Sequence, residues 1–160
     1  MAERVLALAP APFHRLALRI AHRVRRQWWR LRKPTLQGCR VLGLDQAGRV
    51  LLVRHSYGSG NWMPPGGGLK PGEDPLLAAA REFREEIGID LGDAWLVSST
   101  HDVLHGAGNV SYIVAGNCSA TPRPDRREII EAGFFTPGDW PEPMGEGLKR
   151  QMEEWLKVER

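Results

Sequence analysis

The first hydrophobic pattern of the chain lies in residues 13–31, where apolar side chains return every three or four positions. This spacing is typical of an amphipathic helix, and its arginines fall elsewhere on the helical wheel. The helix should end before Pro34, which cannot donate a helical hydrogen bond. We therefore divide the chain into a basic amphipathic helix with its linker, residues 1–36, and a domain of residues 37–160.

Short apolar runs in the domain predict strands. Residues 40–44 and 49–54 flank a turn-rich stretch and predict a hairpin. Residues 57–72 are dense in Gly and Pro, which predicts a loop around one brief strand. The same reasoning predicts further strands at residues 94–104, 110–115 and 129–135.

Two helices are expected among these strands, at residues 75–87 and 146–158. Asp74 and Pro75 suit a helix start, and Gly88 suits its end. The first helix has an apolar stripe that should lie on the sheet, formed by Leu76, Ala80, Phe83 and Ile87. This order of elements predicts an α/β fold in which helices cover a mixed sheet.

The distribution of charge singles out the N-terminal segment. The whole chain of 160 residues has a net charge of +3, but residues 1–33 contain nine Lys or Arg and one Glu. The segment therefore carries +8 and the remainder −5. Such a basic helix could dock on anionic lipid, contact RNA phosphates, or pack on its own domain or on a second subunit of a homodimer.

Length and composition exclude several classes of protein. A hydrophobic fraction of 42% and a charged fraction of 26% are ordinary for one folded domain. Cys39 and Cys118 lie far apart, which predicts free thiols rather than a disulfide framework or zinc site. The chain has neither a membrane-length apolar run nor a signal-peptide pattern, so we expect a cytoplasmic protein.

Three glutamates on the helix at residues 75–87 are candidates for chemistry. Glu82, Glu85 and Glu86 are three and four positions apart, so their carboxylates should converge. Like charges persist at such spacing when water solvates them or when a cation neutralises them, and magnesium prefers oxygen ligands. The helix alone leaves both interpretations open, since Arg81 and Arg84 could also pair with these acids.

The residues around these glutamates resemble the Nudix box, G-x5-E-x7-R-E-U-x-E-E-x-G-U, where U is aliphatic or aromatic. Every constrained position is matched, by Gly67, Glu73, Arg81, Glu82, Phe83, Glu85, Glu86, Gly88 and Ile89. The wider resemblance to the Nudix family extends over residues 38–145. It implies an α/β/α sandwich with a mixed sheet.

The resemblance implies roles for these residues. Glu82, Glu85 and Glu86 would ligate magnesium, or manganese in its place, and Glu82 is the residue sometimes assigned as general base. Arg81 would orient the cluster and Glu73 would brace that arginine. All but Glu73 count as candidate catalytic residues.

The resemblance also implies metal ligands outside the helix. The backbone carbonyl of Gly66 matches a common additional ligand. An acid several residues before an aromatic strand end often completes such sites. Glu128, six residues before Phe134, fits best, and Glu131 is the competitor.

Aromatic residues before the box are candidates for substrate binding. Tyr57 and Trp62 could stack on a nucleobase, or they could anchor the core or a loop. His55, His101 and His105 are assigned no role.

The resemblance implies magnesium-dependent cleavage of a diphosphate linkage in a nucleoside diphosphate joined to another group. One alternative is a pyrophosphohydrolase acting on the 5′ end of RNA, with the basic helix gripping phosphates. Another is a ligand-sensing module without turnover. The sequence does not choose the substrate, because specificity in this family lies in loops outside the box.

Overall fold

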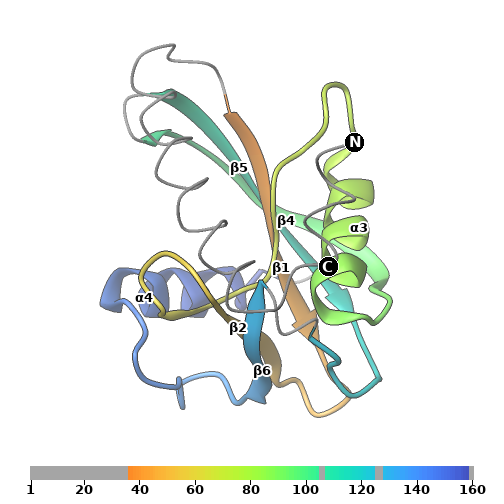
Figure 1. The fold of residues 1–160 in the computed structure, drawn as a ribbon, viewed down its shortest axis with the longest axis vertical. Helices are drawn as coiled ribbons and strands as arrows, with labels where there is room; N and C mark the ends of the chain where they lie inside the picture. The colour runs from red at the N-terminus through yellow and green to blue at the C-terminus, as the bar shows by residue number, and fades with distance from the viewer. Residues whose placement is uncertain (1–35, 105–106, 125–127, 159–160) are drawn as a thin grey trace, which may run out of the picture.

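A six-stranded mixed sheet forms the centre of the computed structural model, which describes residues 36–104, 107–124 and 128–158 (Figure 1). Its strands are β1 (Leu36–Leu44), β2 (Val50–His55), β3 (Trp62–Met63), β4 (Gly92–Leu104), β5 (Ala107–Asn117) and β6 (Ile129–Phe135). The strand order is β3-β2-β1-β5-β4, and β6 also pairs with β2. Strands β1 and β5 run parallel, and the other pairs are antiparallel.

The predicted hairpin is confirmed, and the strands predicted at residues 94–104 and 110–115 also pair with each other. Strands β1 and β2 join at the pair Leu44–Val50, and β4 pairs with β5 along most of its length. The bounds of β6 are as predicted, whereas β1, β4 and β5 each extend beyond the predicted apolar run. The extension of β1 begins at Leu36 and pairs with β5, so tertiary pairing rather than local hydrophobicity sets its start.

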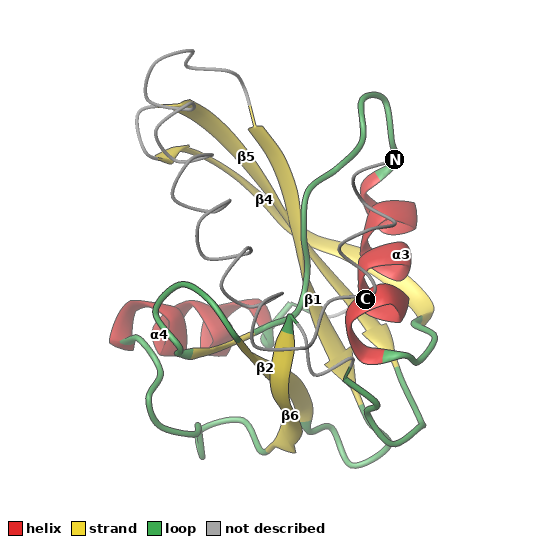
Figure 2. Ribbon diagram, viewed as in Figure 1, coloured by secondary structure: helices red, strands yellow, loops and turns green. Residues whose placement is uncertain are grey.

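Helices cover the two faces of the sheet, which confirms the predicted layers (Figure 2). They are α3 (Pro75–Ile87) and α4 (Glu146–Trp155). Val41 and Leu51 belong to the buried cluster under α3. Their neighbours Leu42 and Leu52 belong to the cluster around Met152 of α4. This alternation along each strand is what a sheet with two buried faces requires.

Helix α3 has the predicted start and end. The Asp74 carboxylate accepts hydrogen bonds from the backbone N–H groups of Leu76 and Leu77, at 2.8 and 3.2 Å. Gly88 closes the helix in the left-handed conformation, with φ of 73°, and its N–H donates to the carbonyl of Arg84. The capping chemistry therefore fixes where the glutamates lie along the helix.

The buried face of α3 differs in part from the predicted stripe. Phe83 and Ile87 are buried as predicted, and the half-buried Leu76 packs against the same core cluster, but the remaining buried positions are Ala78, Ala79 and Glu86 rather than Ala80. The helix is turned so that the Phe83 ring lies over Gly43, where a Cβ would come within 2.6 Å of the ring. Glu86, three positions after Phe83, lies on the buried side as well.

The predicted helix at residues 13–31 lies outside the described residues. Helix α4 ends at Trp155, earlier than predicted. Among the helices of the described ranges, none has both the length and the apolarity to cross a membrane.

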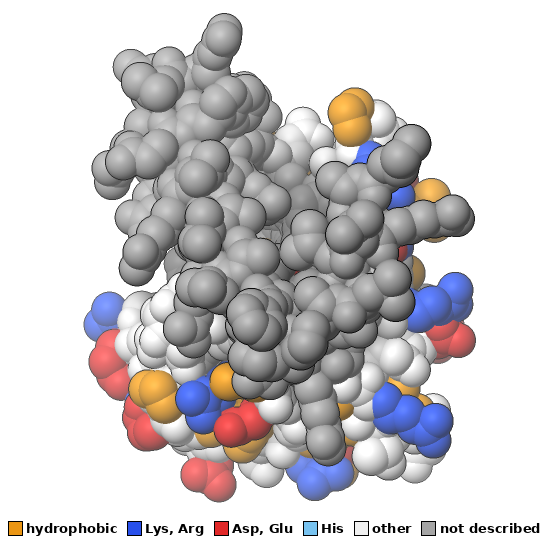
Figure 3. Space-filling model, in the orientation of Figure 1, with side chains coloured by type: hydrophobic (Ala, Val, Ile, Leu, Met, Phe, Trp, Pro, Cys, Tyr) orange, Lys and Arg blue, Asp and Glu red, His pale blue; other side chains and the backbone are white. Residues whose placement is uncertain are grey.

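Charged side chains on the described surface are mixed in sign. Figure 3 shows Lys and Arg interspersed with Asp and Glu along the lower part of that face. Arg84 pairs with Asp90, and Lys149 pairs with Glu142 and Glu146. Exposed pairs of this kind contribute little to stability.

Truncating Phe83 should cost far more stability than truncating Leu77 on the same helix. Phe83 is fully buried, so Phe83→Ala should lower the free energy of unfolding by about 3–5 kcal/mol. Leu77 is 68% exposed, so Leu77→Ala should change it by less than about 0.5 kcal/mol. Urea unfolding of both variants measures the difference, and equal losses would contradict this placement of the helix.

Candidate metal and catalytic site

The glycine-rich loop between β3 and α3 runs beside β1 at residues 65–69 and shares backbone hydrogen bonds with it. The N–H of Val41 donates to the carbonyl of Pro65 at 2.8 Å, and the N–H of Cys39 donates to the carbonyl of Gly67 at 2.9 Å. A further bridge joins Gly38 and Gly68. These bonds hold the backbone of the loop beside α3.

Glu86 and Gly66 are in direct contact. The carboxylate of Glu86 accepts a hydrogen bond from the N–H of Gly66 at 3.0 Å, and its residue is only 9% exposed. Gly66 has φ of 145°, and a Cβ there would lie 2.2 Å from the carbonyl oxygen of Cys39. The position therefore requires glycine, which lets the backbone approach the carboxylate closely.

Glu82 lies against the next glycine of the loop. A Cβ on Gly67 would be 2.5 Å from the carboxyl carbon of Glu82. The same carboxylate accepts a hydrogen bond from Nη1 of Arg81 at 2.6 Å. The structure thus brings Gly66, Gly67, Glu82 and Glu86 together, with a peptide backbone on one side and two carboxylates on the other.

Arg81 is held by a forked ion pair with Glu73. Its Nε and Nη2 donate to the two carboxylate oxygens at 2.8 and 2.9 Å, and Nη2 also donates to the carbonyl of Gly68 at 3.2 Å. The Glu73 carboxylate also accepts from the N–H of Lys70. These donors lower the pKa of Glu73 to about 2, and the carboxylates raise the pKa of Arg81. The contact that the resemblance implied between these two residues is present.

Glu85 faces solvent at the edge of this arrangement. Its side chain is 61% exposed and lies 3.6 Å from Nη1 of Arg81. Within the described residues, no three His, Cys, Asp or Glu side chains come close enough to hold a metal ion together. The Glu82 carboxylate is turned to Arg81 and the Glu86 carboxylate to Gly66.

The donors of this site are nevertheless suited to a hard divalent cation. Carboxylate and backbone oxygens are the ligands that magnesium prefers. The lack of a Cβ at Gly67 lets the Glu82 carboxylate lie directly against the loop backbone. The residues present therefore fit magnesium or manganese.

The two candidate acids beyond the helix have different surroundings. Glu131 on β6 pairs with Arg54 of β2 at 3.0 Å, and its side chain is 49% exposed. The backbone carbonyl of Glu128 accepts from the N–H of Ser56 at 2.8 Å. Glu131 is therefore already paired with an arginine. Arg54 was not among the residues predicted to contribute to the site, because its partner lies 77 positions away in the sequence.

Trp62 packs as a core residue. It is 9% exposed, and its ring meets Phe135 edge-on with centroids 4.9 Å apart. Tyr57 is half-buried, with its ring 5.2 Å from that of His55. Burial lowers the pKa of His55. Of the two aromatic candidates, Tyr57 keeps the more accessible ring.

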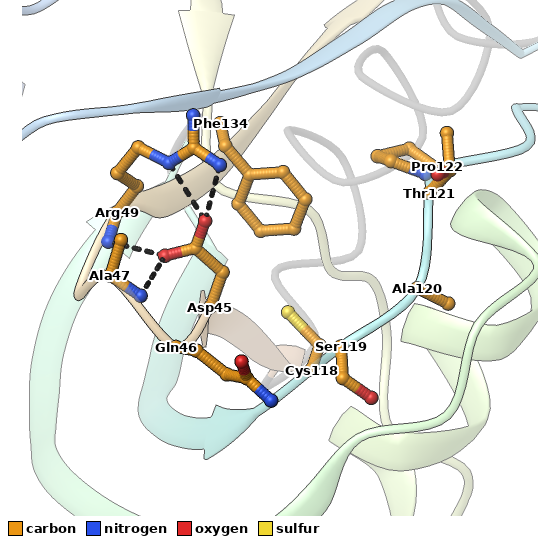
Figure 4. A pocket seen from close by; sticks show the side chains of 10 residues that line it. All are labelled: Asp45, Gln46, Ala47, Arg49, Cys118, Ser119, Ala120, Thr121, Pro122 and Phe134. Atoms are coloured by element: carbon orange, nitrogen blue, oxygen red, sulfur yellow. Dashed lines mark hydrogen bonds and ion pairs between the residues drawn. The ribbon is translucent and has the colours of Figure 1, made fainter.

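A separate hollow of about 420 Å³ lies between the β1–β2 turn and the segment after β5 (Figure 4). Asp45 and Arg49 form an ion pair at its rim, and Phe134 and Cys118 face it. Cys118 is a buried free thiol, and burial raises its pKa to about 11. None of the candidate ligands lines this hollow, so it is distinct from the glutamate site.

The family model of the NUDIX domain matches residues 36–156, which include every element described above. The chain belongs to the NUDIX domain family. The predicted resemblance is therefore confirmed, and the match continues through α4.

Relatives of this NUDIX chain include enzymes with different substrates in their names. The chain is 33% identical over 123 residues to diphosphoinositol polyphosphate phosphohydrolase 2 of Rattus norvegicus, covering 76% of this chain and 56% of that protein. It is 40% identical over 60 residues to RNA pyrophosphohydrolase of Proteus mirabilis, covering 38% and 34%. The chain thus spans little more than half the length of the first relative.

A solved structure shares the fold. The MutT NUDIX hydrolase from Burkholderia pseudomallei superposes with a TM-score of 0.65 at 25% identity, covering 78% of this chain and 97% of that chain.

The ion pair between Glu73 and Arg81 should make stability depend on acid pH. The pKa of Glu73 falls from an ordinary value of 4.5 to about 2 on folding. The native state therefore binds this proton less readily, so the stabilisation is present above about pH 4.5 and is lost as the pH falls towards 2. Urea unfolding of the wild type and Glu73→Gln should differ at pH 7 and converge near pH 2. Glu153→Gln, on the exposed side of α4, controls for the loss of one carboxylate.

Proposed function

We propose that this chain is a magnesium-dependent hydrolase that cleaves a diphosphate linkage, with manganese as a substitute metal. The observation that carries this proposal is the contact of Glu86 with the Gly66 backbone, inside a complete Nudix box. Beside it, the braced Arg81 fixes Glu82. The family membership and the relatives support a hydrolase of this kind.

The residues that would hold the metal are Glu82, Glu85, Glu86, the carbonyl of Gly66 and Glu128. A divalent cation held there would neutralise phosphate charge and would lower the pKa of a water molecule. A carboxylate of the cluster would accept the proton of the attacking water. Arg81 keeps the Glu82 carboxylate in place while Glu73 holds the guanidinium. Rigid positioning of this kind is the protein's main contribution to phosphoryl chemistry.

We propose as substrate a nucleoside diphosphate linked to another group. The expected products are two monophosphates, one of the nucleoside and one of the other group. The names of the relatives support a substrate with adjacent phosphates and do not agree on the group that carries them.

Hydrolysis at the 5′ end of RNA is the second candidate. Its support is the 40% identity to an RNA pyrophosphohydrolase and the charge of +8 in residues 1–33. Activity on triphosphorylated RNA should then fall steeply with salt, and deletion of residues 1–33 should weaken RNA binding. A sensor without turnover is the third candidate, and the complete set of box glutamates argues against it.

A substrate screen tests the proposal. Purified protein with magnesium is incubated with nucleoside triphosphates, dinucleoside polyphosphates, nucleotide sugars, ADP-ribose, NADH and triphosphorylated RNA. We expect release of a monophosphate or phosphate from at least one class, and loss of that release after chelation of the metal. A complete absence of products would favour the sensor.

A further inference from the structure

Arg54, near the end of β2, links segments from different parts of the chain. Its Nε donates to the carbonyl of Gly60 at 3.0 Å, and its Nη1 donates to the Glu131 carboxylate at 3.0 Å. Its guanidinium carbon also lies 6.0 Å from the centroid of the Trp62 ring. One half-buried side chain therefore connects β2, the following loop, β3 and β6.

These contacts surround an irregularity in the sheet. The register between β2 and β6 shifts between Arg54 and His55. A bulge of this kind disrupts the ladder locally and re-aims the residues beyond it. Just past it, the N–H of Ser56 donates to the carbonyl of Glu128. The backbone of Glu128 thus meets the end of β2 just beyond this irregularity, next to the point where Arg54 joins the two strands.

We propose that Arg54 is a positioning residue for the metal site, which keeps the start of β6, and with it Glu128, in register with the end of β2. The inference rests on the proposed function, because it takes Glu128 as a metal ligand. Arg54 acts through Glu131 and the Gly60 carbonyl. Its rigid fork bonds both at once, whereas a lysine ammonium on a flexible stem is a single point charge.

The role is distinguishable from that of an ordinary ion pair. Glu131 is 49% exposed, and pairs this exposed contribute little to stability on their own. Residues that orient metal ligands typically change metal affinity by about 10- to 100-fold when mutated. Loss of Arg54 should therefore weaken metal binding much more than it weakens folding.

The test measures manganese binding by electron paramagnetic resonance on the full chain without substrate. Arg54→Ala should weaken binding by about 10-fold, and Arg54→Lys should recover part of that loss. Arg49→Ala is a matched control, because Arg49 pairs with Asp45 and lies 5.7 Å from the Phe134 ring at the other end of β2. It should bind manganese as the wild type does.

A double-mutant cycle tests whether Arg54 affects metal binding through Glu128. In a Glu128→Ala background, Arg54→Ala should have little further effect on manganese affinity, because the ligand it positions is gone. If the losses of manganese affinity in the two single variants multiply in the double variant, the proposal is overturned. Wild-type manganese affinity in folded Arg54→Ala would overturn it as well. If that variant does not fold, Arg54→Lys and Glu131→Gln replace it in the same cycle. Manganese binding by a wild-type protein that hydrolyses no substrate would overturn the proposed function alone.

Discussion

Replacing Glu86 with Gln should abolish magnesium-dependent hydrolysis while leaving the fold intact. The amide has nearly the same shape, and its oxygen can still accept the N–H of Gly66. The substitution removes the negative charge that a cation requires. Turnover should therefore fall by more than about 100-fold, which exceeds the loss typical of residues that only orient metal ligands. The free energy of unfolding should change by about 1 kcal/mol or less.

Steady-state hydrolysis of the best substrate from the screen measures this effect, with circular dichroism and urea unfolding on the same sample. Glu153→Gln on α4 removes one carboxylate far along the chain and should keep full activity. Unchanged turnover in Glu86→Gln would remove this residue from the site.

Replacing Gly67 with Ala should give the second large effect. The new Cβ would lie 2.5 Å from the carboxyl carbon and one oxygen of Glu82, so the carboxylate must move. The end of a flexible side chain can move at little cost to folding. The carboxylate, however, would leave the position that Arg81 fixes, so turnover should fall by about 10- to 100-fold.

Gly68→Ala is the matched control one residue later. The nearest atom to its Cβ would be 3.9 Å away, and the Gly68 carbonyl that accepts from Arg81 would remain. Turnover and magnesium dependence should stay near the wild-type values. Equal losses in both variants would indicate that any side chain in this loop is harmful, and that Glu82 is not the cause.

Local signals predicted the helix at the centre of the site. Asp74, Pro75 and Gly88 act within a few residues of themselves, and the structure has α3 with the predicted bounds. The depth of Glu86 was not predictable in this way. The Glu86 carboxylate contacts the N–H of Gly66, which lies 20 positions earlier in the sequence, in a loop that pairs with β1.

Contacts distant in sequence account for the other differences. The pairing of the glycine-rich loop with β1, the ion pair of Arg54 with Glu131, and the burial of Trp62 against Phe135 each need the assembled sheet. The spacing of hydrophobic residues along the sequence does not reveal such pairs. The motif predicted which residues lie at the site, and the fold determines that Glu86 is buried and Glu85 is exposed.

The bonds between the glycine-rich loop and β1 bear on how the protein can move. The loop shares backbone hydrogen bonds with a central strand, at Cys39 and Val41. Opening it would require breaking part of the ladder that holds the core, and core strands open only on the slowest timescales of a protein. The loop backbone beside Glu82 and Glu86 therefore belongs to the permanent framework, and any movement around these carboxylates must come from segments that share no bonds with β1.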